Sequence, residues 1–214
     1  ALESAISHGI PVDVLTADGI RDKYPHFKIQ DSYTGLFESN AGFLRPEEAI
    51  RAACAHACRK NNTNHVEIWD QVDVDHLEED DNGSDDIVTL YLNNGAIVQT
   101  KSVIVSAGAW ASTLLPYDTW GKHLSVTRQL QVWLAPDNGL DFTPETVPIW
   151  LYSPPEGTKR ANGEDALPLY GVPVNKYDPA HPNCIKIGLH HRPVNVQDPS
   201  EYKEVTPDEK SEVL

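Results

Sequence analysis

The pattern of apolar and polar positions predicts a chain that mixes helices with strands. The strongest helical pattern runs from Pro46 to about Lys60, where apolar residues recur at helical spacing behind a proline and two acidic residues suited to a helix start. Shorter elements are expected before it: the end of a helix at 1–8, a strand at 12–15, a helix capped by Thr16 that stops before Pro25, and a strand at 34–38.

Residues 65–106 give the clearest architectural signal. Strands are expected at 65–69, 72–77, 87–92 and 96–100, and the last three form a meander. Asn82-Gly83 and Asn94-Gly95 mark its two turns, because these dipeptides are typical of type I′ hairpins. The acidic cluster around the first turn suits a solvated hairpin tip or a calcium site, although its spacing is not that of an EF-hand loop.

A nearly continuous apolar run follows at Ser102-Val103-Ile104-Val105-Ser106. Such a run predicts a strand buried on both faces, as in a parallel sheet. A short helix is expected next, ending at Leu115, and then further strands at 124–134, 149–152, 167–172 and 184–190, with a polar loop at 153–166. The fold class is therefore α+β, or mixed, with a small α/β portion up to about residue 115 and a mostly antiparallel sheet after it.

The candidate chemistry lies on the predicted strand 184–190. Period-2 alternation places Ile185, Ile187 and Leu189 on one face, and Cys184, Lys186, Gly188 and His190 on the other. A glycine between a cation and a titratable ring would let a flat ligand or another backbone come close. A solvent-facing edge of a sheet, which tolerates the same residues, is the alternative.

Tyr170, on the preceding predicted strand, either offers its hydroxyl to a carboxylate or packs its ring.

Charge and spacing exclude several classes of function. A formal net charge of −15 argues against nucleic-acid partners, which require a basic face. No apolar run is long enough to span a membrane, no signal peptide begins the sequence, and no zinc spacing or Gly-x-Ser-x-Gly elbow occurs. No two of the 13 glycines lie two residues apart, so the Gly-x-Gly-x-x-Gly loop that holds a dinucleotide pyrophosphate is absent from these residues.

Four motifs together carry a family resemblance. They are Gly35–Gly42 followed by Arg45-Pro46-Glu47, Ser106–Trp110, Tyr170–Pro173 and Lys186–His190. In this order they resemble the FAD-dependent amine oxidases of the monomeric sarcosine oxidase and N-methyltryptophan oxidase type, over nearly the whole chain.

The resemblance implies part of an FAD-binding α/β domain and a mostly antiparallel substrate domain. It divides the chain into 1–40, which begins the substrate domain, 41–115, which belongs to the FAD-binding domain and holds the meander, and 116–214, which continues the substrate domain. It also implies oxidation of a secondary amino acid such as sarcosine to an imine, with oxygen reduced to hydrogen peroxide.

The same resemblance assigns roles to individual residues. Lys186 matches a lysine near the flavin N5 edge, where a fixed cation stabilises the charge that develops as oxygen is reduced. Tyr170 and His190 match substrate-orienting positions. Val72 matches a valine whose backbone meets the adenine end of FAD, and Gly108 is expected near the cofactor.

Two departures from the family lead us to expect a central fragment. The glycine-rich segment and the flavin-linking cysteine have no counterpart in these 214 residues, so the chain by itself is expected to be inactive and to bind no FAD tightly. Two alternatives remain open: a flavin oxidase of pipecolate or fructosyl amino acids, and a cofactor-free β-rich binding module. We expect a cytoplasmic or peroxisomal location.

Overall fold

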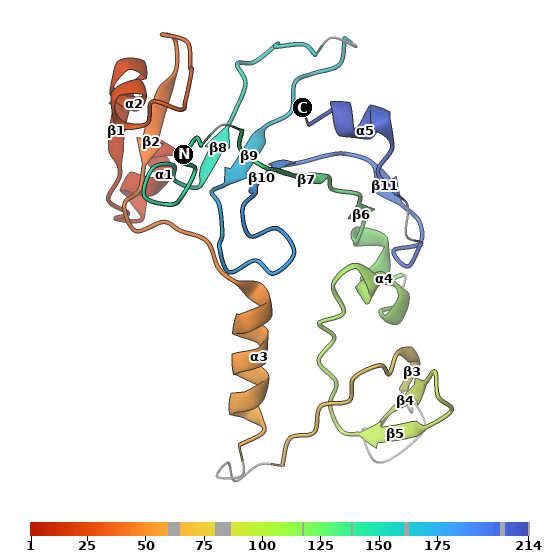
Figure 1. Ribbon diagram of the computed structural model, residues 1–214. Coiled ribbons are helices and arrows are strands. Elements are labelled where there is room, and N and C mark those ends of the chain that lie inside the picture. The colour runs from red at the N-terminus through yellow and green to blue at the C-terminus, as the bar shows by residue number, and fades with distance from the viewer. Residues whose placement is uncertain are drawn as a thin grey trace. The chain divides into compact units, whose positions relative to one another are not determined.

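The computed structural model describes residues 1–59, 65–79, 87–116, 118–137, 139–160, 163–201 and 204–213 (Figure 1). The chain forms two compact units. Unit 1 combines Ala1–Leu44, Gln129–Arg192 and Val205–Leu214, and unit 2 combines Arg45–Arg128 with Pro193–Glu204. Every strand pairing among the described residues is antiparallel, and the predicted mixed fold of helices and mainly antiparallel sheet is confirmed.

Unit 1 is built on a four-stranded sheet in the order β7-β10-β9-β8. Its strands are β7 (Gln131–Leu134), β10 (Ile185–Leu189), β9 (Leu169–Val172) and β8 (Trp150–Tyr152). One face carries an apolar cluster of Leu130, Leu189 and Val213, with Val132, Leu167, Leu169 and Ile187 packed against it. Val213 comes just after helix α5 (Pro207–Ser211), so the end of the chain covers the core face.

The first elements of unit 1 follow the sequence pattern closely. They are α1 (Leu2–Ser7), β1 (Asp13–Thr16), α2 (Ala17–Lys23) and β2 (Thr34–Phe37), and β1 pairs with β2. The Thr16 hydroxyl accepts a hydrogen bond from the Gly19 N–H at 3.2 Å, which confirms the predicted cap of α2.

Aromatic contacts join this N-terminal part to the sheet. The rings of Phe27 and Trp150 meet edge-on, with centroids 5.9 Å apart, and the hydroxyls of Tyr33 and Tyr152 are hydrogen-bonded. Trp150 in turn lies on Gly171, where an added Cβ would come within 2.3 Å of the indole ring. The glycine in β9 is therefore required by packing on the core face.

Unit 2 contains helix α3 (Pro46–Ala57), the predicted meander and several short elements. The meander forms a sheet in the order β3-β4-β5, made of β3 (Val74–Glu79), β4 (Val88–Leu92) and β5 (Ile97–Thr100). The short elements are the 3-10 helices η1 (Gly108–Trp110) and η2 (Gly121–His123), helix α4 (Ala111–Leu114), and strand β6 (Val126–Thr127) paired with β11 (Asn195–Val196).

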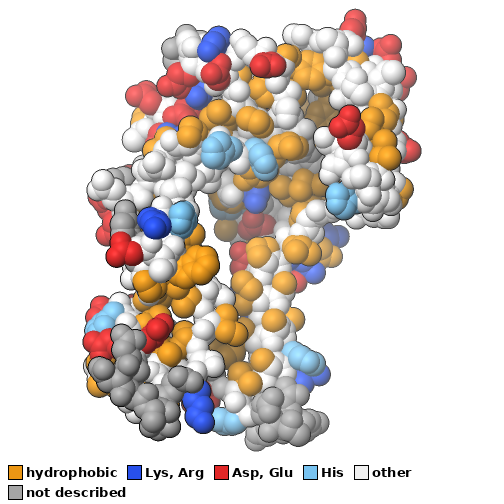
Figure 2. All heavy atoms as spheres, turned by 180° about the vertical axis from the view of Figure 1, so that it is seen from behind, with side chains coloured by type: hydrophobic (Ala, Val, Ile, Leu, Met, Phe, Trp, Pro, Cys, Tyr) orange, Lys and Arg blue, Asp and Glu red, His pale blue; other side chains and the backbone are white. Residues whose placement is uncertain are grey.

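Two predicted strands of unit 2 are not strands in the structure. Residues 65–69 and 102–106 run without sheet pairing, and Ile104 is 91% exposed. A strand needs neighbours for its backbone groups, and no described strand pairs with either segment. Figure 2 shows apolar side chains open at the surface over much of this unit. The prediction of a buried parallel strand was wrong for the chain as it stands.

The predicted long strand 124–134 is divided in two. Its first part, β6, pairs with β11 in unit 2, whereas its second part, β7, pairs with β10 in unit 1. Residues 128–130 between them belong to neither strand. The hydrogen-bonded ladder is therefore interrupted at residues 128–130, although the apolar pattern of the sequence is continuous.

The turn at Asn94-Gly95 is not type I′, because only Gly95, with φ 82°, has a positive φ. The Leu92 N–H donates to the Ala96 carbonyl at 3.0 Å and the Gly95 N–H donates to the Leu92 carbonyl at 2.9 Å, which leaves three residues in the loop. The other predicted turn, Asn82-Gly83, and most of the acidic cluster around it lie outside the described residues.

Within the part of the chain that the structure describes, no helix has the length and apolarity needed to cross a membrane.

Candidate functional site

The candidate site is the face of the unit 1 sheet opposite its apolar core. In the register of β10, Lys186 lies between Val172 and Trp133, and Gly188 lies between Tyr170 and Gln131. Directly paired residues of an antiparallel sheet project from the same face. The structure thus brings Lys186 and Tyr170 to one face, and because β10 is an inner strand, the sheet-edge interpretation of Lys186 and Gly188 was wrong.

Tyr170 lies across Gly188. A Cβ built on Gly188 would be 2.7 Å from both the hydroxyl oxygen and Cζ of Tyr170, and Gly188 is buried. The space left by the missing side chain is therefore filled by the Tyr170 ring, and the expectation that a flat ligand approaches the backbone there was wrong.

The environment of Tyr170 keeps its phenol neutral. Burial raises the pKa of Tyr170 above its usual value, and a hydrogen bond with the Gln131 side chain opposes this shift only in part. A neutral phenol retains a proton that it can donate to a carboxylate. The packing alternative for Tyr170 is confirmed, because its ring covers Gly188, whereas the offer of its hydroxyl to a carboxylate stays a prediction.

His190 follows the last residue of β10 and contacts Tyr170. Its backbone N–H donates to the Pro168 carbonyl at 2.8 Å, and its ring meets the Tyr170 ring edge-on with centroids 6.5 Å apart. The residue is exposed, whereas Lys186 is half-buried. The sheet thus gathers a cation, a neutral phenol and an accessible imidazole, which are groups able to bind and orient an amino acid.

The sequence interpretation missed two residues on this face, Gln131 and Trp133. Exposure alternates along β7 in the structure, where residues 131 and 133 are exposed and 132 and 134 are half-buried, but the sequence Gln-Val-Trp-Leu shows no polar–apolar alternation. No local pattern identifies the residues of β10 that lie opposite them, because the register of β7 against β10 is fixed only in the folded sheet.

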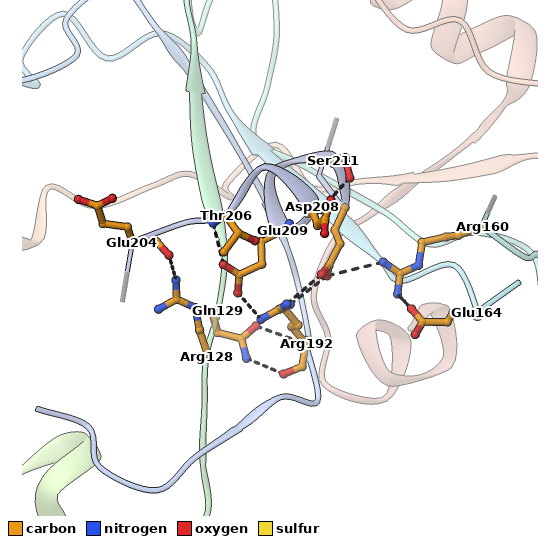
Figure 3. Close-up of polar contacts among 11 residues, drawn as sticks. Arg128, Gln129, Arg160, Glu164, Arg192, Glu204, Thr206, Asp208, Glu209 and Ser211 are labelled. Atoms are coloured by element: carbon orange, nitrogen blue, oxygen red, sulfur yellow. Dashed lines mark hydrogen bonds and ion pairs between the residues drawn. The ribbon is translucent and has the colours of Figure 1, made fainter. Parts of the chain in front are cut away.

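A second missed group holds the end of β10 (Figure 3). Arg192, which is 6% exposed, donates through Nε and Nη2 to the two carboxylate oxygens of Glu212 at 2.9 and 2.8 Å. The Gln129 amide binds the Arg192 backbone in both directions, accepting its N–H at 3.1 Å and donating to its carbonyl at 3.2 Å. The bond from Arg192 holds the pKa of the Glu212 carboxyl below its usual value. The network ties the C-terminal segment to the strand end that carries His190.

The C-terminal helix α5 also had a readable signal. Thr206 and Glu209 form a reciprocal capping box, in which the Glu209 N–H donates to the Thr206 hydroxyl at 3.2 Å and the Thr206 N–H donates to the Glu209 carboxylate at 3.0 Å. The Thr-Pro-Asp-Glu sequence at 206–209 matches that motif, so the helix start could have been predicted locally.

The two residues predicted to meet the cofactor lie in unit 2. Val72 is half-buried and follows Gln71, whose φ is 57°. Gly108 begins η1 with φ 54°, and no atom lies within 4 Å of the position that a Cβ would occupy. Its backbone is therefore open to close approach, and the turn is held by Trp110, whose indole N–H donates to the Ser200 hydroxyl at 2.9 Å.

Residues 1–180 match the family described as FAD dependent oxidoreductase. The chain belongs to this family. The family depends on FAD, and the matched stretch includes Val72, Gly108 and Tyr170.

Bacterial oxidases are among the curated relatives of the chain. N-methyl-L-tryptophan oxidase of Salmonella typhi is 29% identical over 204 residues, which are 94% of this chain and 46% of the relative. The protein of the same name from Salmonella dublin is 28% identical over 208 residues, with the same shares covered. The chain thus spans about half the length of the curated relatives it matches.

A solved structure supports the fold. The open form of NikD, described as an unusual amino acid oxidase essential for nikkomycin biosynthesis, superposes with a TM-score of 0.61 and 16% sequence identity, covering 99% of this chain and 49% of NikD. At this identity the likeness concerns the fold alone.

Proposed function

We propose that this chain supplies the substrate face and part of the flavin site of an oxidase acting on secondary amino acids, the N-methyl amino acids among them. The observation that carries the proposal is the placing of Lys186, Tyr170 and His190 on one face of the unit 1 sheet, away from its core. Membership of an FAD-dependent family and relatives named N-methyl-L-tryptophan oxidase support it, and the same membership argues against a cofactor-free binding module.

The residues divide between holding the substrate and supplying charge. The neutral Tyr170 phenol, fixed between Gly188 and Gln131, would donate to the substrate carboxylate, and His190 would set the angle of approach from its exposed position beside the Tyr170 ring. Lys186 would place a fixed positive charge where negative charge develops on oxygen.

The residues of this chain fit backbone contacts with FAD at Val72 and Gly108 better than they fit its pyrophosphate. Val72 and the open, left-handed Gly108 offer backbone to the cofactor, whereas no glycine-rich loop among the 214 residues can cradle its pyrophosphate. Bound FAD would take two electrons from the amine and pass them to oxygen, giving an imine and hydrogen peroxide. The protein's contribution is to orient the amino acid and to place Lys186.

The test uses the full-length protein that contains this chain. It is expected to be yellow, to release flavin when denatured, and to produce hydrogen peroxide and an imine with N-methyl amino acids. Hydrolysis of the imine releases formaldehyde and the primary amino acid if the N-methyl carbon is oxidised, or methylamine and a 2-oxo acid if Cα is oxidised. Oxidation of pipecolate or fructosyl amino acids in place of these would redirect the substrate assignment. A colourless protein without extractable flavin would refute the oxidase proposal.

A further inference from the structure

Trp133 and His181 form an aromatic pair beside Lys186 that no role described so far requires. The two rings are stacked, with centroids 4.7 Å apart and planes 23° from parallel. Trp133 is the direct cross-strand partner of Lys186, and therefore projects from the face that carries Tyr170. We propose that this pair is a subsite that receives a flat aromatic side chain of the amino-acid substrate, an assignment that rests on the proposed function above.

The loop between β9 and β10 holds His181 in place. The Asp178 carboxylate accepts the backbone N–H of Ala180 at 2.9 Å and that of His181 at 3.0 Å. The N–H groups of His181 and Ala180 hold the pKa of Asp178 below its usual value, and the Trp133 side chain adds a smaller contribution through its own hydrogen bond. One carboxylate thus fixes the backbone under His181 and touches the indole that His181 stacks on.

Trp133 keeps a large open surface although one partner is already stacked on it. It remains 38% exposed on the face away from the apolar core of unit 1. An indole whose plane is fixed in advance loses little conformational entropy when another flat ring packs against it. An aromatic ring that covers this surface removes apolar area from water.

The position of the Trp133–His181 pair beside Lys186 decides which part of a bound substrate would reach the two rings. If Lys186 marks the reacting centre, its cross-strand partner Trp133 on β7 stands next to that centre, within reach of the side chain of a bound amino acid. A sarcosine molecule has no side chain and would leave Trp133 uncovered. The geometry therefore favours N-alkyl amino acids with an aromatic side chain over the smallest and the purely aliphatic ones.

The decisive experiment compares two substrates in three variants of the flavin-containing full-length protein. Trp133→Leu removes the ring and retains apolar bulk, and Trp133→Phe retains a smaller ring. Trp120→Leu is the control, since Trp120 is 65% exposed and lies outside the sheet that carries the site. The value of kcat/KM is measured for N-methyl-L-tryptophan and for sarcosine.

Trp133→Leu is expected to lower kcat/KM for N-methyl-L-tryptophan by about 10- to 100-fold, in the range of a lost apolar pocket contact, and that for sarcosine by less than about 3-fold. For Trp133→Phe, kcat/KM for N-methyl-L-tryptophan is expected to lie between the values of Trp133→Leu and the unchanged protein. For Trp120→Leu, both values of kcat/KM are expected to match those of the unchanged protein. Equal losses on both substrates would overturn the subsite, because they would show a merely structural role.

A binding measurement separates this inference from the oxidase proposal. 3-Indolepropionate carries the ring and carboxylate but has no amine to oxidise. Its affinity for the full-length protein, measured by isothermal titration calorimetry, is expected to fall about tenfold in Trp133→Leu. If neither amine is oxidised but this fall is seen, the oxidase proposal fails and the aromatic subsite stands. If amines are oxidised and the affinity is unchanged, the subsite fails alone.

His181 is a positioning residue in this account. His181→Ala is expected to weaken 3-indolepropionate binding about threefold, and His181→Phe to restore it because a ring can stack again. Failure of the phenylalanine variant to restore binding would contradict the stacking role.

Discussion

The ring of Tyr170 occupies the space that a side chain at residue 188 would need. Its hydroxyl oxygen lies 2.7 Å from the position of a Cβ on Gly188. Glycine at this position therefore determines how closely the Tyr170 phenol lies to the sheet. Because the Tyr170 ring contacts the His190 ring, Gly188 also affects the position of His190.

Gly188→Ala is expected to displace the Tyr170 ring. Overpacking of this kind costs about 1–3 kcal/mol of the free energy of unfolding, and the moved phenol should lower kcat/KM on the amine substrate in the full-length protein. The stability control is Gly42→Ala, since no atom lies within 4 Å of a Cβ there and a change within about 0.5 kcal/mol is expected. Chemical denaturation measures the free energy of unfolding of the two variants, and equal destabilisation by Gly188→Ala and Gly42→Ala would contradict the close packing on Gly188.

Lys186→Met tests the proposed electrostatic role. In stopped-flow experiments, we expect reoxidation of the reduced flavin by oxygen to slow by about 10²-fold or more, while reduction by the amine changes far less. The matched control is Lys176→Met, which removes the ammonium that lies 5.2 Å from the Tyr177 ring centroid, and it should leave both half-reactions unchanged. Equal slowing of both half-reactions by Lys186→Met would refute the role.

The 214-residue chain alone should bind FAD weakly. The pyrophosphate accounts for much of the recognition of a dinucleotide, and the glycine spacing provides no loop to hold it. A spectral titration of the isolated chain is expected to show no saturation at micromolar FAD. Micromolar or tighter affinity would mean that residues such as Val72 and Gly108 suffice for binding.

Acid should weaken the attachment of the C-terminal segment. The hydrogen bond from Arg192 lowers the pKa of Glu212 in the folded chain. The stabilising contribution of Glu212 is therefore present above its ordinary pKa of 4.5 and is lost as the pH falls through the lower pKa of the folded state. Urea unfolding of the chain from pH 6 to pH 3 should therefore show a fall in stability below pH 4.5, and Glu212→Gln should reduce that fall.

Removing Arg192 is a stronger perturbation than removing an exposed ion pair. Arg192→Leu leaves Glu212, whose side chain is only 24% exposed, without its main partner and should cost about 3 kcal/mol. Lys159→Ala breaks a pair whose side chains are 56% and 74% exposed and should cost less than about 1 kcal/mol. Similar losses in the two variants would show that the Arg192 network has no special importance.

The segment 102–106 should exchange its backbone hydrogens rapidly in this chain. It has no sheet pairing, and Ile104 is 91% exposed. Hydrogen exchange is expected to be fast at residues 103–106 and slow in β10, whose backbone groups are paired on both sides. Protection of 103–106 equal to that of β10 would mean that this segment is paired in solution.

The sequence by itself determined the features that depend on near neighbours. Helix α3 follows from apolar spacing behind Pro46, the start of α2 follows from the Thr16 cap, and the two faces of β10 follow from period-2 alternation. Each of these depends on residues a few positions apart, and such interactions are the same wherever the segment lies in the fold.

The tertiary structure alone decided which residues share the candidate site. Whether Lys186 lies at an edge or inside the sheet, whether Gly188 is open or covered, and which ring stands beside Lys186 all depend on the register among β7, β9 and β10. The same holds for the absence of pairing at 102–106. The apolar run there predicts a buried strand, but a strand forms only where another strand lies beside it. Register and neighbours arise from contacts between distant residues, and no local pattern encodes them.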